Sequence, residues 1–154
     1  MQLNDILRQG AVRVLPKVNS KKRLFCGLAD IARDVHGLNQ ADALGALQDR
    51  ESLGPTGVGD GVALPHARLD GLTDVHGVFV RLETPLDFDA TDRKPVDLVF
   101  ALFAPEGAGV AHLKALALVS RTLRDSSLCA KLRANHDPSI LYTVLTEAQA
   151  SQAA

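Results

Sequence analysis

The residues best suited to chemistry lie in a glycine-rich stretch that ends in a histidine. Within eight residues the chain carries four glycines, Gly54, Gly57, Gly59 and Gly61. Glycine readily adopts positive φ and leaves backbone N–H groups accessible, so such a loop suits the binding of an anion. His66 follows the loop with an imidazole that can act as a nucleophile, and Arg50 precedes it with a guanidinium that can hold negative charge. The stretch therefore favours chemistry on an oxyanion.

The backbone around His66 predicts a fixed position for its ring. Val62 to Leu64 forms a short β-type run, and Pro65 ends that run while biasing Leu64 toward extended geometry. We therefore expect His66 at the exit of a short strand. The spacing does not single out a carboxylate that would orient the imidazole among the three nearby in sequence, Asp60, Asp70 and Asp74.

On the residues alone, three interpretations of this stretch stay open. It can be a simple connection between a helix and a strand, part of a metal site, or the site of a phosphohistidine. The chain has neither an H-E-x-x-H nor a C-x-x-C spacing, and none of its histidines stands four residues from another, so a zinc site has weak support. No Gly-Lys-Ser/Thr follows the glycines, which argues against a Walker A nucleotide site.

Two helices are predicted before the loop. Ser20 is a favourable N-cap, apolar residues then recur at helical spacing, and Gly37 ends the first helix. Asn39 caps the second, which ends near Glu51 and so places Arg50 in its last turn. A cation at a helix C-terminus is favourable by itself, by about 0.3–1 kcal/mol. Arg50 thus has a structural explanation beside the phosphate-facing one.

The later pattern predicts an α/β fold. Residues 11–15 are expected to form an edge strand and 77–82 another strand, with a turn at Thr84-Pro85. Val96 to Phe103 is nearly all apolar, which is typical of a central strand buried on both faces. Such a strand needs helices above and below it. The expected fold class is therefore α/β, a single domain with a mixed β-sheet flanked by helices on both faces.

Three helices are expected after the central strand, over about 110–124, 126–134 and 138–147, the last begun by Asp137-Pro138. His112 would lie in the first turn of the first of them. A helix N-terminus disfavours imidazolium and favours an anion, so a neutral His112 beside a phosphate is physically reasonable. A surface histidine at a helix start is the alternative. Residues 148–154 are expected to form a frayed tail.

Composition bounds the class of protein. With 154 residues, 46% hydrophobic and 23% charged, the chain suits one domain with a real core. A formal net charge of −1 provides no field for nucleic acid or an anionic membrane, so neither partner is implied. The longest apolar run is too short to span a bilayer, and the first residues lack the features of a signal peptide. We expect a cytoplasmic protein in which Cys26 and Cys129 are reduced thiols.

Two blocks of the sequence resemble a known family. The first block is similar to the active-site signature of the enzyme IIA component, fructose/mannitol type, of the phosphoenolpyruvate-dependent sugar phosphotransferase system. It consists of Glu51, six further residues, Val58-Gly59, two further residues and Val62-Ala63-Leu64-Pro65-His66-Ala67. A second block, residues 83–102, resembles the middle of the same family. The similarity extends from about residue 3 to 146, and the enzyme IIA domain is accordingly expected over 3–147. Many members have Gly-Lys after the histidine, where this chain has Ala67-Arg68.

The resemblance implies roles for the candidate residues. His66 would be the phosphoryl acceptor, through its Nε2 atom, and Arg50 and His112 would hold the phosphoryl oxygens. A phosphate-binding loop is implied at Thr56, Gly57, Gly59 and Gly61. Arg50 and His112 should then lie within about 12 Å of the His66 ring, since direct oxyanion contacts need about 3 Å even after rearrangement. Neither a cofactor nor a metal is implied, because phosphoryl transfer needs positioning and charge stabilisation.

The implied function is phosphotransfer with a regulatory output. The donor would be an HPr-like phosphocarrier, itself phosphorylated by an enzyme I that uses phosphoenolpyruvate. The free-standing chain is most like the nitrogen-regulatory branch of enzyme IIA, whose members would bind target proteins, such as transporters or sensor kinases, differently in their two phosphorylation states. A sugar-specific enzyme IIA that passes phosphate to a IIB partner is the alternative within the family. A non-catalytic sensor of small anions is the alternative outside it.

Overall fold

The computed structural model describes residues 1–153, with side chains described as far as Glu147. The chain begins with a short helix, α1 (Leu3–Ile6), and an edge strand, β1 (Leu7–Leu15). Two helices follow, α2 (Lys21–His36) and α3 (Gln40–Ser52). Three short strands come next: β2 (Gly57–Gly59), β3 (Val62–Ala63) and β4 (His66–Leu69). The remaining elements are β5 (His76–Leu86), β6 (Val96–Pro105), α4 (Gly109–Leu123), α5 (Ser126–Arg133) and α6 (Pro138–Ala153).

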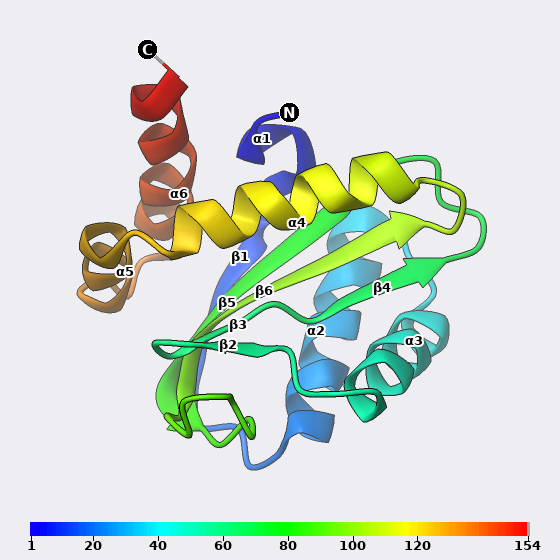
Figure 1. Cartoon of the computed structure of the whole chain (residues 1–154), viewed down its shortest axis with the longest axis horizontal. Helices are drawn as coiled ribbons and strands as arrows, with labels where there is room; N and C mark the ends of the chain where they lie inside the picture. The colour runs from blue at the N-terminus through cyan, green and yellow to red at the C-terminus, as the bar shows by residue number, and fades with distance from the viewer. Residues whose placement is uncertain (154) are drawn as a thin grey trace.

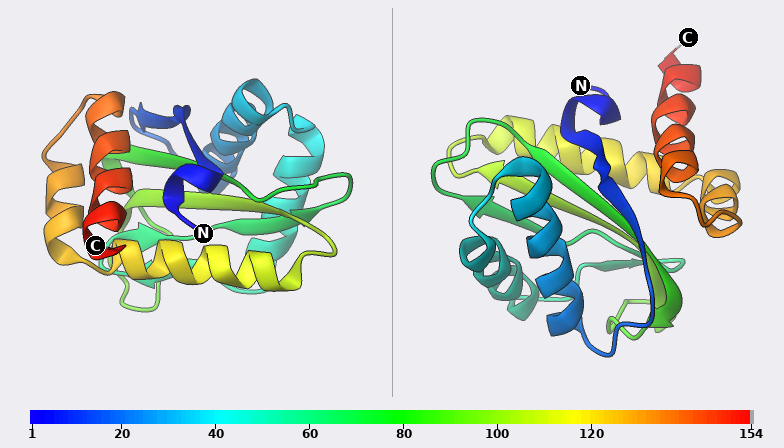
Figure 2. Two further views of the ribbon diagram at one scale, coloured as in Figure 1. Left: turned by 90° about the horizontal axis from the view of Figure 1, so that it is seen from above. Right: turned by 180° about the vertical axis from the view of Figure 1, so that it is seen from behind.

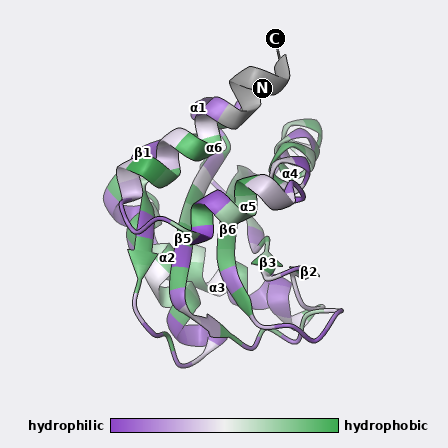
Figure 3. Ribbon diagram, turned by 90° about the vertical axis from the view of Figure 1, so that its left-hand side faces the viewer, coloured by the Kyte–Doolittle hydropathy of each residue, from purple (hydrophilic) through white to green (hydrophobic). Residues whose placement is uncertain are grey.

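The six strands form one mixed sheet in the order β1-β5-β6-β3-β2, with β4 also paired to β6. β1 is parallel to β5, β5 is antiparallel to β6, and β3 and β4 are both parallel to β6. β6 lies in the middle of the sheet, and its residues from Leu98 to Ala104 are at most 1% exposed. The predicted central strand is thereby confirmed. Hydrophobic segments follow β1, β5 and β6 through the interior (Figure 3).

Helices cover the two faces of this sheet, as the apolar central strand requires. α2 and α3 lie on one face and α4 on the other, with α5 and α6 beyond one end of α4 (Figures 1 and 2). The predicted α/β class, with a mixed sheet between helices, is confirmed. Among the described residues, no helix is long and apolar enough to cross a membrane. Cys26 and Cys129 are free thiols, as expected.

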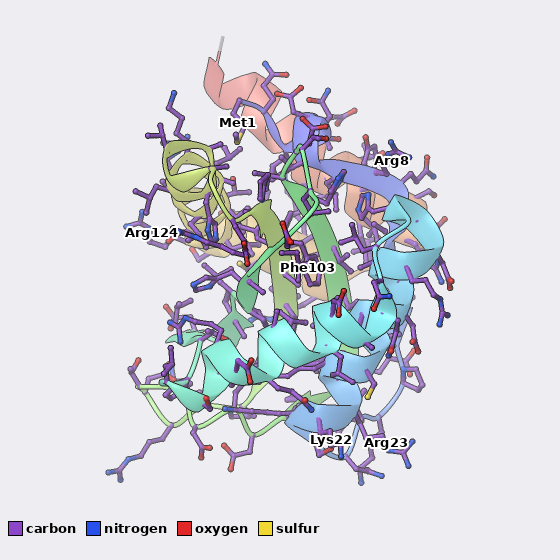
Figure 4. The ribbon with its side chains drawn as sticks, turned by 90° about the vertical axis from the view of Figure 1, so that its right-hand side faces the viewer. Met1, Arg8, Lys22, Arg23, Phe103 and Arg124 are labelled. Atoms are coloured by element: carbon purple, nitrogen blue, oxygen red, sulfur yellow. The ribbon has the colours of Figure 1, made fainter. Side chains whose placement is uncertain are left out.

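The predicted helix caps form as expected. The Ser20 hydroxyl accepts a hydrogen bond from Arg23 N at 3.1 Å, and the Asn39 side chain accepts one from Asp42 N at 2.9 Å. Gly37 ends α2 at a φ of 72°, a conformation that favours glycine. Figure 4 shows α3 crossing in front of the sheet, with Lys22 and Arg23 extending outward from the first turn of α2 and Phe103 lying behind, on β6. These caps fix where α3 begins and therefore help to set where Arg50 lies.

Two local predictions were wrong and a third was incomplete. The short strand β3 does end before Pro65, as predicted, but Leu102 N donates to Pro65 O and the chain then resumes pairing with β6, so His66 is also the first residue of β4. Thr84-Pro85 is not a turn, because the strand continues to Leu86, which pairs with Val96 after a shift in register. The last helix does not end near Glu147. It continues to Ala153, so the expected tail is helical to that point, and Ala154 lies outside the described residues.

Candidate functional site

A cavity of about 450 Å³ collects side chains from the end of α3, from β4 and from the first turns of α4. These three segments are distant in sequence. The central strand brings two of them together, because β4 pairs with β6 and α4 follows β6 in the chain. The cavity contains both histidines and the arginine that the sequence singled out. Its lining consists of Ala46, Asp49, Arg50, His66, Ala67, Arg68, His112, Leu113 and Leu116.

Arg50 lies in the last turn of α3, as predicted, and its guanidinium points back toward β4. Its Nη1 donates to the carbonyl of Gly54 at 3.0 Å, and its Nε donates to His66 Nε2 at 3.3 Å. The first bond anchors the guanidinium on the turn after α3. The second places a permanent positive charge at the ring nitrogen of His66 that the family resemblance names as the phosphoryl acceptor.

His66 is half-buried, and its two ring nitrogens have different partners. Nδ1 lies 2.9 Å from the carbonyl oxygen of Leu64, which can only accept, so Nδ1 carries the proton. Nε2 therefore keeps its lone pair, and Arg50 donates to it. Burial lowers the pKa of His66; the bond to Leu64 raises it and the charge of Arg50 lowers it. The imidazole is thus neutral at neutral pH, with Nε2 as its nucleophilic atom.

His112 lies in the first turn of α4 and is only 4% exposed, which rules out the alternative of a surface histidine at a helix start. Its ring centre lies 5.4 Å from that of His66, and the two rings meet edge to face at 70°. Burial lowers the pKa of His112, and so do the neighbouring His66 ring, through its protonated form, and the positive charge of Arg68. The expected proximity of Arg50 and His112 to the His66 ring is observed.

Arg68 belongs to this group, although the sequence did not single it out. Its Nε donates to His112 Nδ1 at 3.3 Å. The signal was available, because residues two apart on a strand share a face, and Arg68 stands two residues after His66. The group that orients His66 was also missed. That acceptor is the backbone carbonyl of Leu64 and none of the three nearby aspartates, all of which are exposed.

Glu51 ties the end of α3 to the glycine-rich stretch. Its carboxylate, with 8% of the side chain exposed, accepts hydrogen bonds from both the backbone N–H and the hydroxyl of Thr56. Lys21 of α2 lies 3.3 Å from the same carboxylate. A carboxylate this buried is stable only when paired and hydrogen-bonded, and here it has both kinds of partner. The backbone N–H and the hydroxyl of Thr56 are therefore both already bonded to Glu51.

The structure does not bring the glycine loop into the cavity, since its members are absent from the described lining. Other parts of the chain pack closely against these glycines. A Cβ atom at Gly57 would lie 2.9 Å from the Cβ of Ala90, and one at Gly61 would lie 2.5 Å from Nη2 of Arg133. Gly61 also has a φ of 79°. Arg133 reaches this point because it pairs with Asp97 through Nε and Nη2 at 2.9–3.1 Å.

The remaining histidines lie apart from this site. A second cavity, of about 480 Å³, is lined by α1, the start of β1, the end of α2 and the start of β5, and it contains His36 and His76. Although it is slightly larger, it contains none of Arg50, His66 or His112. Among the described residues there is no group of three or more histidine, cysteine, aspartate or glutamate side chains placed to hold a metal ion.

Comparison with known proteins found a matching family model and similar relatives. The family model described as "Phosphoenolpyruvate-dependent sugar phosphotransferase system, EIIA 2" matches residues 5–148. A nitrogen regulatory protein of Bradyrhizobium diazoefficiens is 47% identical over 145 residues, which cover 94% of this chain and 95% of the relative. The crystal structure of nitrogen regulatory protein IIA-Ntr from Neisseria meningitidis superimposes with a TM-score of 0.84 at 37% identity, covering 94% of this chain and 99% of that one.

A sugar-specific relative is also similar, though over less of the chain. The fructose-specific EIIA component of Haloferax volcanii is 36% identical over 121 residues, or 78% of this chain and 79% of the relative. The family model and the nitrogen regulatory relatives cover nearly the whole sequence, including the cavity residues of α3, β4 and α4. The chain therefore belongs to the EIIA 2 family of the phosphoenolpyruvate-dependent sugar phosphotransferase system.

Proposed function

We propose that this protein accepts a phosphoryl group on Nε2 of His66 from an HPr-like phosphocarrier and regulates target proteins through its phosphorylation state. Membership of the family implies phosphotransferase activity and interaction with a phosphocarrier and with IIB or target proteins. One observation carries the assignment of the atom. Nδ1 of His66 donates to Leu64 O at 2.9 Å, which leaves the Nε2 lone pair facing Arg50 in a cavity of about 450 Å³.

In the proposed step, the Nε2 lone pair of His66 attacks phosphorus, and the bond between phosphorus and the donor breaks. The leaving atom of the donor keeps the bonding electron pair. His66 retains its Nδ1 proton, so its ring gains positive charge, which the carbonyl of Leu64 stabilises through the existing hydrogen bond. Arg50 moves from the nitrogen to the phosphoryl oxygens, and its anchor on Gly54 O keeps it within reach.

Apolar side chains beside the cavity provide a surface for a protein donor. Val110 and Leu113 flank His112 in α4, and they are 69% and 65% exposed. A donor protein that covers them would exclude water from the space between the two phosphate-carrying groups, which strengthens the electrostatic contacts of Arg50. The proposed site thus has both a charged centre and an apolar rim.

The proposed output is regulatory because nitrogen regulatory proteins that are 35–47% identical match 94–99% of the chain. Phosphorylation would add a charge of about −1.5 to −2 at neutral pH, enough to change the affinity of an interface that includes the cavity. We place this exchange in the cytoplasm, where the phosphocarriers act. A sugar-specific role, with transfer to a IIB partner, is the second candidate and is favoured by the fructose-specific relative.

The test is transfer from phosphoenolpyruvate through enzyme I and a panel of HPr-type carriers. The wild type should gain one phosphoryl group, labile in acid and stable in base, and His66→Ala should gain none while remaining folded. His136→Ala, at an exposed histidine outside the cavity, is the matched control and should be phosphorylated like the wild type. Pull-down with each form, and transfer to a IIB domain, separates the regulatory role from the sugar role. Failure of every carrier to phosphorylate the wild type would favour a sensor of small anions instead.

A further inference from the structure

His66 and Arg68 point from the same side of β4 into the cavity. They are two residues apart on a strand that pairs in parallel with β6, His66 opposite Leu102 and Arg68 opposite Ala104. Ala67, between them, is buried on the other side. Because both side chains leave the strand in one direction, Arg68 reaches the helix that faces His66 and meets His112 there.

The contact between Arg68 and His112 determines which nitrogen of His112 carries the proton. A guanidinium has five N–H donors, no acceptor and no accessible neutral form. Since Arg68 Nε lies 3.3 Å from His112 Nδ1 and can only donate, Nδ1 must present its lone pair. The proton of the neutral ring is then on Nε2. This tautomer is the reverse of that in His66, where Nδ1 carries the proton.

The Nε2–H group of His112 is buried and has no hydrogen-bond partner among the described residues. A buried donor without an acceptor costs free energy, so native proteins rarely keep one unless a ligand or water completes it. The ring that carries this donor stands edge to face with His66, its centre 5.4 Å away. A phosphoryl group on His66 would bring three acceptor oxygens into this space.

We propose that Arg68 is a positioning residue that holds His112 in its Nε2–H tautomer, so that His112 donates a hydrogen bond to the phosphoryl group on His66. The inference rests on the proposed phosphohistidine function and adds the residue that prepares the donor. Arg68 acts through His112 and needs no contact of its own with the phosphoryl group. Loss of the Arg68 donor lets the His112 proton exchange between the two nitrogens, so that only part of the population presents the required group.

The first experiment is ¹⁵N NMR of the imidazole nitrogens in the unphosphorylated protein, where Nδ1 and Nε2 give separate signals for the protonated and lone-pair states. Wild-type His112 should show a protonated Nε2. Arg68→Met, which keeps an unbranched side chain and removes the donor, should move both nitrogens of His112 toward averaged positions. Arg68→Lys, which keeps a charged donor, should restore them in part. Arg121→Met is the matched control, because Arg121 lies on the exposed side of α4, and it should leave His112 unchanged.

The second experiment is a double-mutant cycle on the rate of phosphoryl acceptance. Arg68→Met should slow the wild type by about tenfold, less than the loss of a direct donor at a reacting group. In a His112→Ala background the same change should add less than about a twofold effect, because two residues that act as one unit are not additive. A full tenfold loss in that background would mean that Arg68 contacts the phosphoryl group directly and would overturn the inference.

The two experiments separate this inference from the proposed function. A His112 tautomer that does not respond to Arg68→Met, in a protein that still accepts phosphate at His66, would overturn the inference alone. A wild type that accepts no phosphoryl group from any carrier would overturn the proposed function, and with it the role of His112 as a donor to the phosphoryl group.

Discussion

The cavity contains two arginine–histidine pairs in which an arginine Nε donates to an imidazole nitrogen over the same distance, but the proton of the imidazole is on a different ring nitrogen in each pair. Arg50 Nε lies 3.3 Å from Nε2 of His66, and Arg68 Nε lies 3.3 Å from Nδ1 of His112. In each pair the arginine must donate, so it selects the nitrogen that keeps a lone pair. The first pair leaves a proton on Nδ1 and the second leaves one on Nε2.

The difference follows from the backbone that carries each ring. His66 opens a strand and bends back to the carbonyl of Leu64, two residues earlier, which holds its Nδ1 proton. His112 lies in the first helical turn, where its own backbone N–H is bonded to Ala108 O and its Nε2–H is left without a described partner. One ring therefore offers a nucleophile and the other a donor. Identical side-chain pairs acquire different chemistry from their local backbone.

The largest effect should come from breaking the first pair. Arg50→Ala removes the charge beside Nε2 of His66, and phosphoryl acceptance should slow by about ten- to a thousandfold, the range for one preorganised donor. The fold should persist, since a cation at a helix C-terminus contributes only about 0.3–1 kcal/mol. Rapid-quench measurement of phosphorylation, with Arg121→Ala as control, checks this. A rate within twofold of the wild type would leave Arg50 with only its helix-end role.

Breaking the second pair should have a smaller effect. His112→Ala removes a donor to the phosphoryl oxygens but leaves the nucleophile intact, so the protein should still be phosphorylated, about ten- to a hundredfold more slowly. His112→Gln, whose amide can place an N–H near the position of Nε2, should recover part of the rate, whereas His112→Asn should not. Equal rates for these two amides would contradict the assignment of the donor to Nε2.

The pH dependence of phosphoryl acceptance tests the contact between Arg50 and His66 in more detail. Acceptance requires neutral His66, and because its pKa is lowered, the rate should fall only as the pH drops to a midpoint below the ordinary value of 6.5. Burial is the largest cause that lowers the pKa of His66; the bond to Leu64 and the charge of Glu51 raise this pKa, and the charges of Arg50 and Arg68 lower it. Arg50→Ala should therefore move the midpoint upward, toward 6.5. NMR titration of the His66 ring measures the midpoint directly, and a downward shift would contradict the placement of Arg50 at Nε2.

Much of the fold was predictable because its signals are local. Ser20 and Asn39 cap helices through atoms within three residues, and the apolar run of β6 requires cover on both faces wherever it lies. The meeting of His66 with His112 was not predictable from spacing, because it depends on the pairing of β4 with β6, the strand that α4 follows. Family resemblance supplied that proximity. The orienting carbonyl of Leu64 was missed because no side chain marks a backbone acceptor.

In the glycine loop, a glycine can be required by contacts with residues that are distant in the sequence. The glycine content predicts that Gly61 exposes an N–H group to an anion, but a Cβ atom at this position would instead meet Arg133 of α5 and Asp97 of β6. Those contacts depend on the tertiary fold and leave no trace near position 61. Three of the four glycines in the stretch, Gly54, Gly59 and Gly61, have positive φ, whereas Gly57 does not.

Of these substitutions, Gly61→Ala should disturb the two arginine–histidine pairs least, because it lies outside the cavity. Its effect should be on the stability of the fold. Its new Cβ would meet the guanidinium of Arg133 at 2.5 Å, and its φ of 79° is strained for alanine. The free energy of unfolding should fall by about 1–3 kcal/mol. Denaturant unfolding measures this loss of stability. Gly45→Ala is the control: Gly45 lies within α3, where an added Cβ atom has no neighbour within 4 Å, so this change should be neutral or stabilising. Equal stability of the two variants would contradict the packing role assigned to Gly61.

The central claim is that the first pair presents Nε2 of His66 as the phosphoryl acceptor. The most direct test is ¹⁵N and ³¹P NMR of the uniformly ¹⁵N-labelled protein after phosphorylation by a matching carrier. We expect one phosphorus signal, coupled to Nε2 of His66, with the Nδ1 proton still hydrogen-bonded to Leu64 O. Phosphorus bonded to Nδ1 of His66, or to a nitrogen of His112, would contradict the claim.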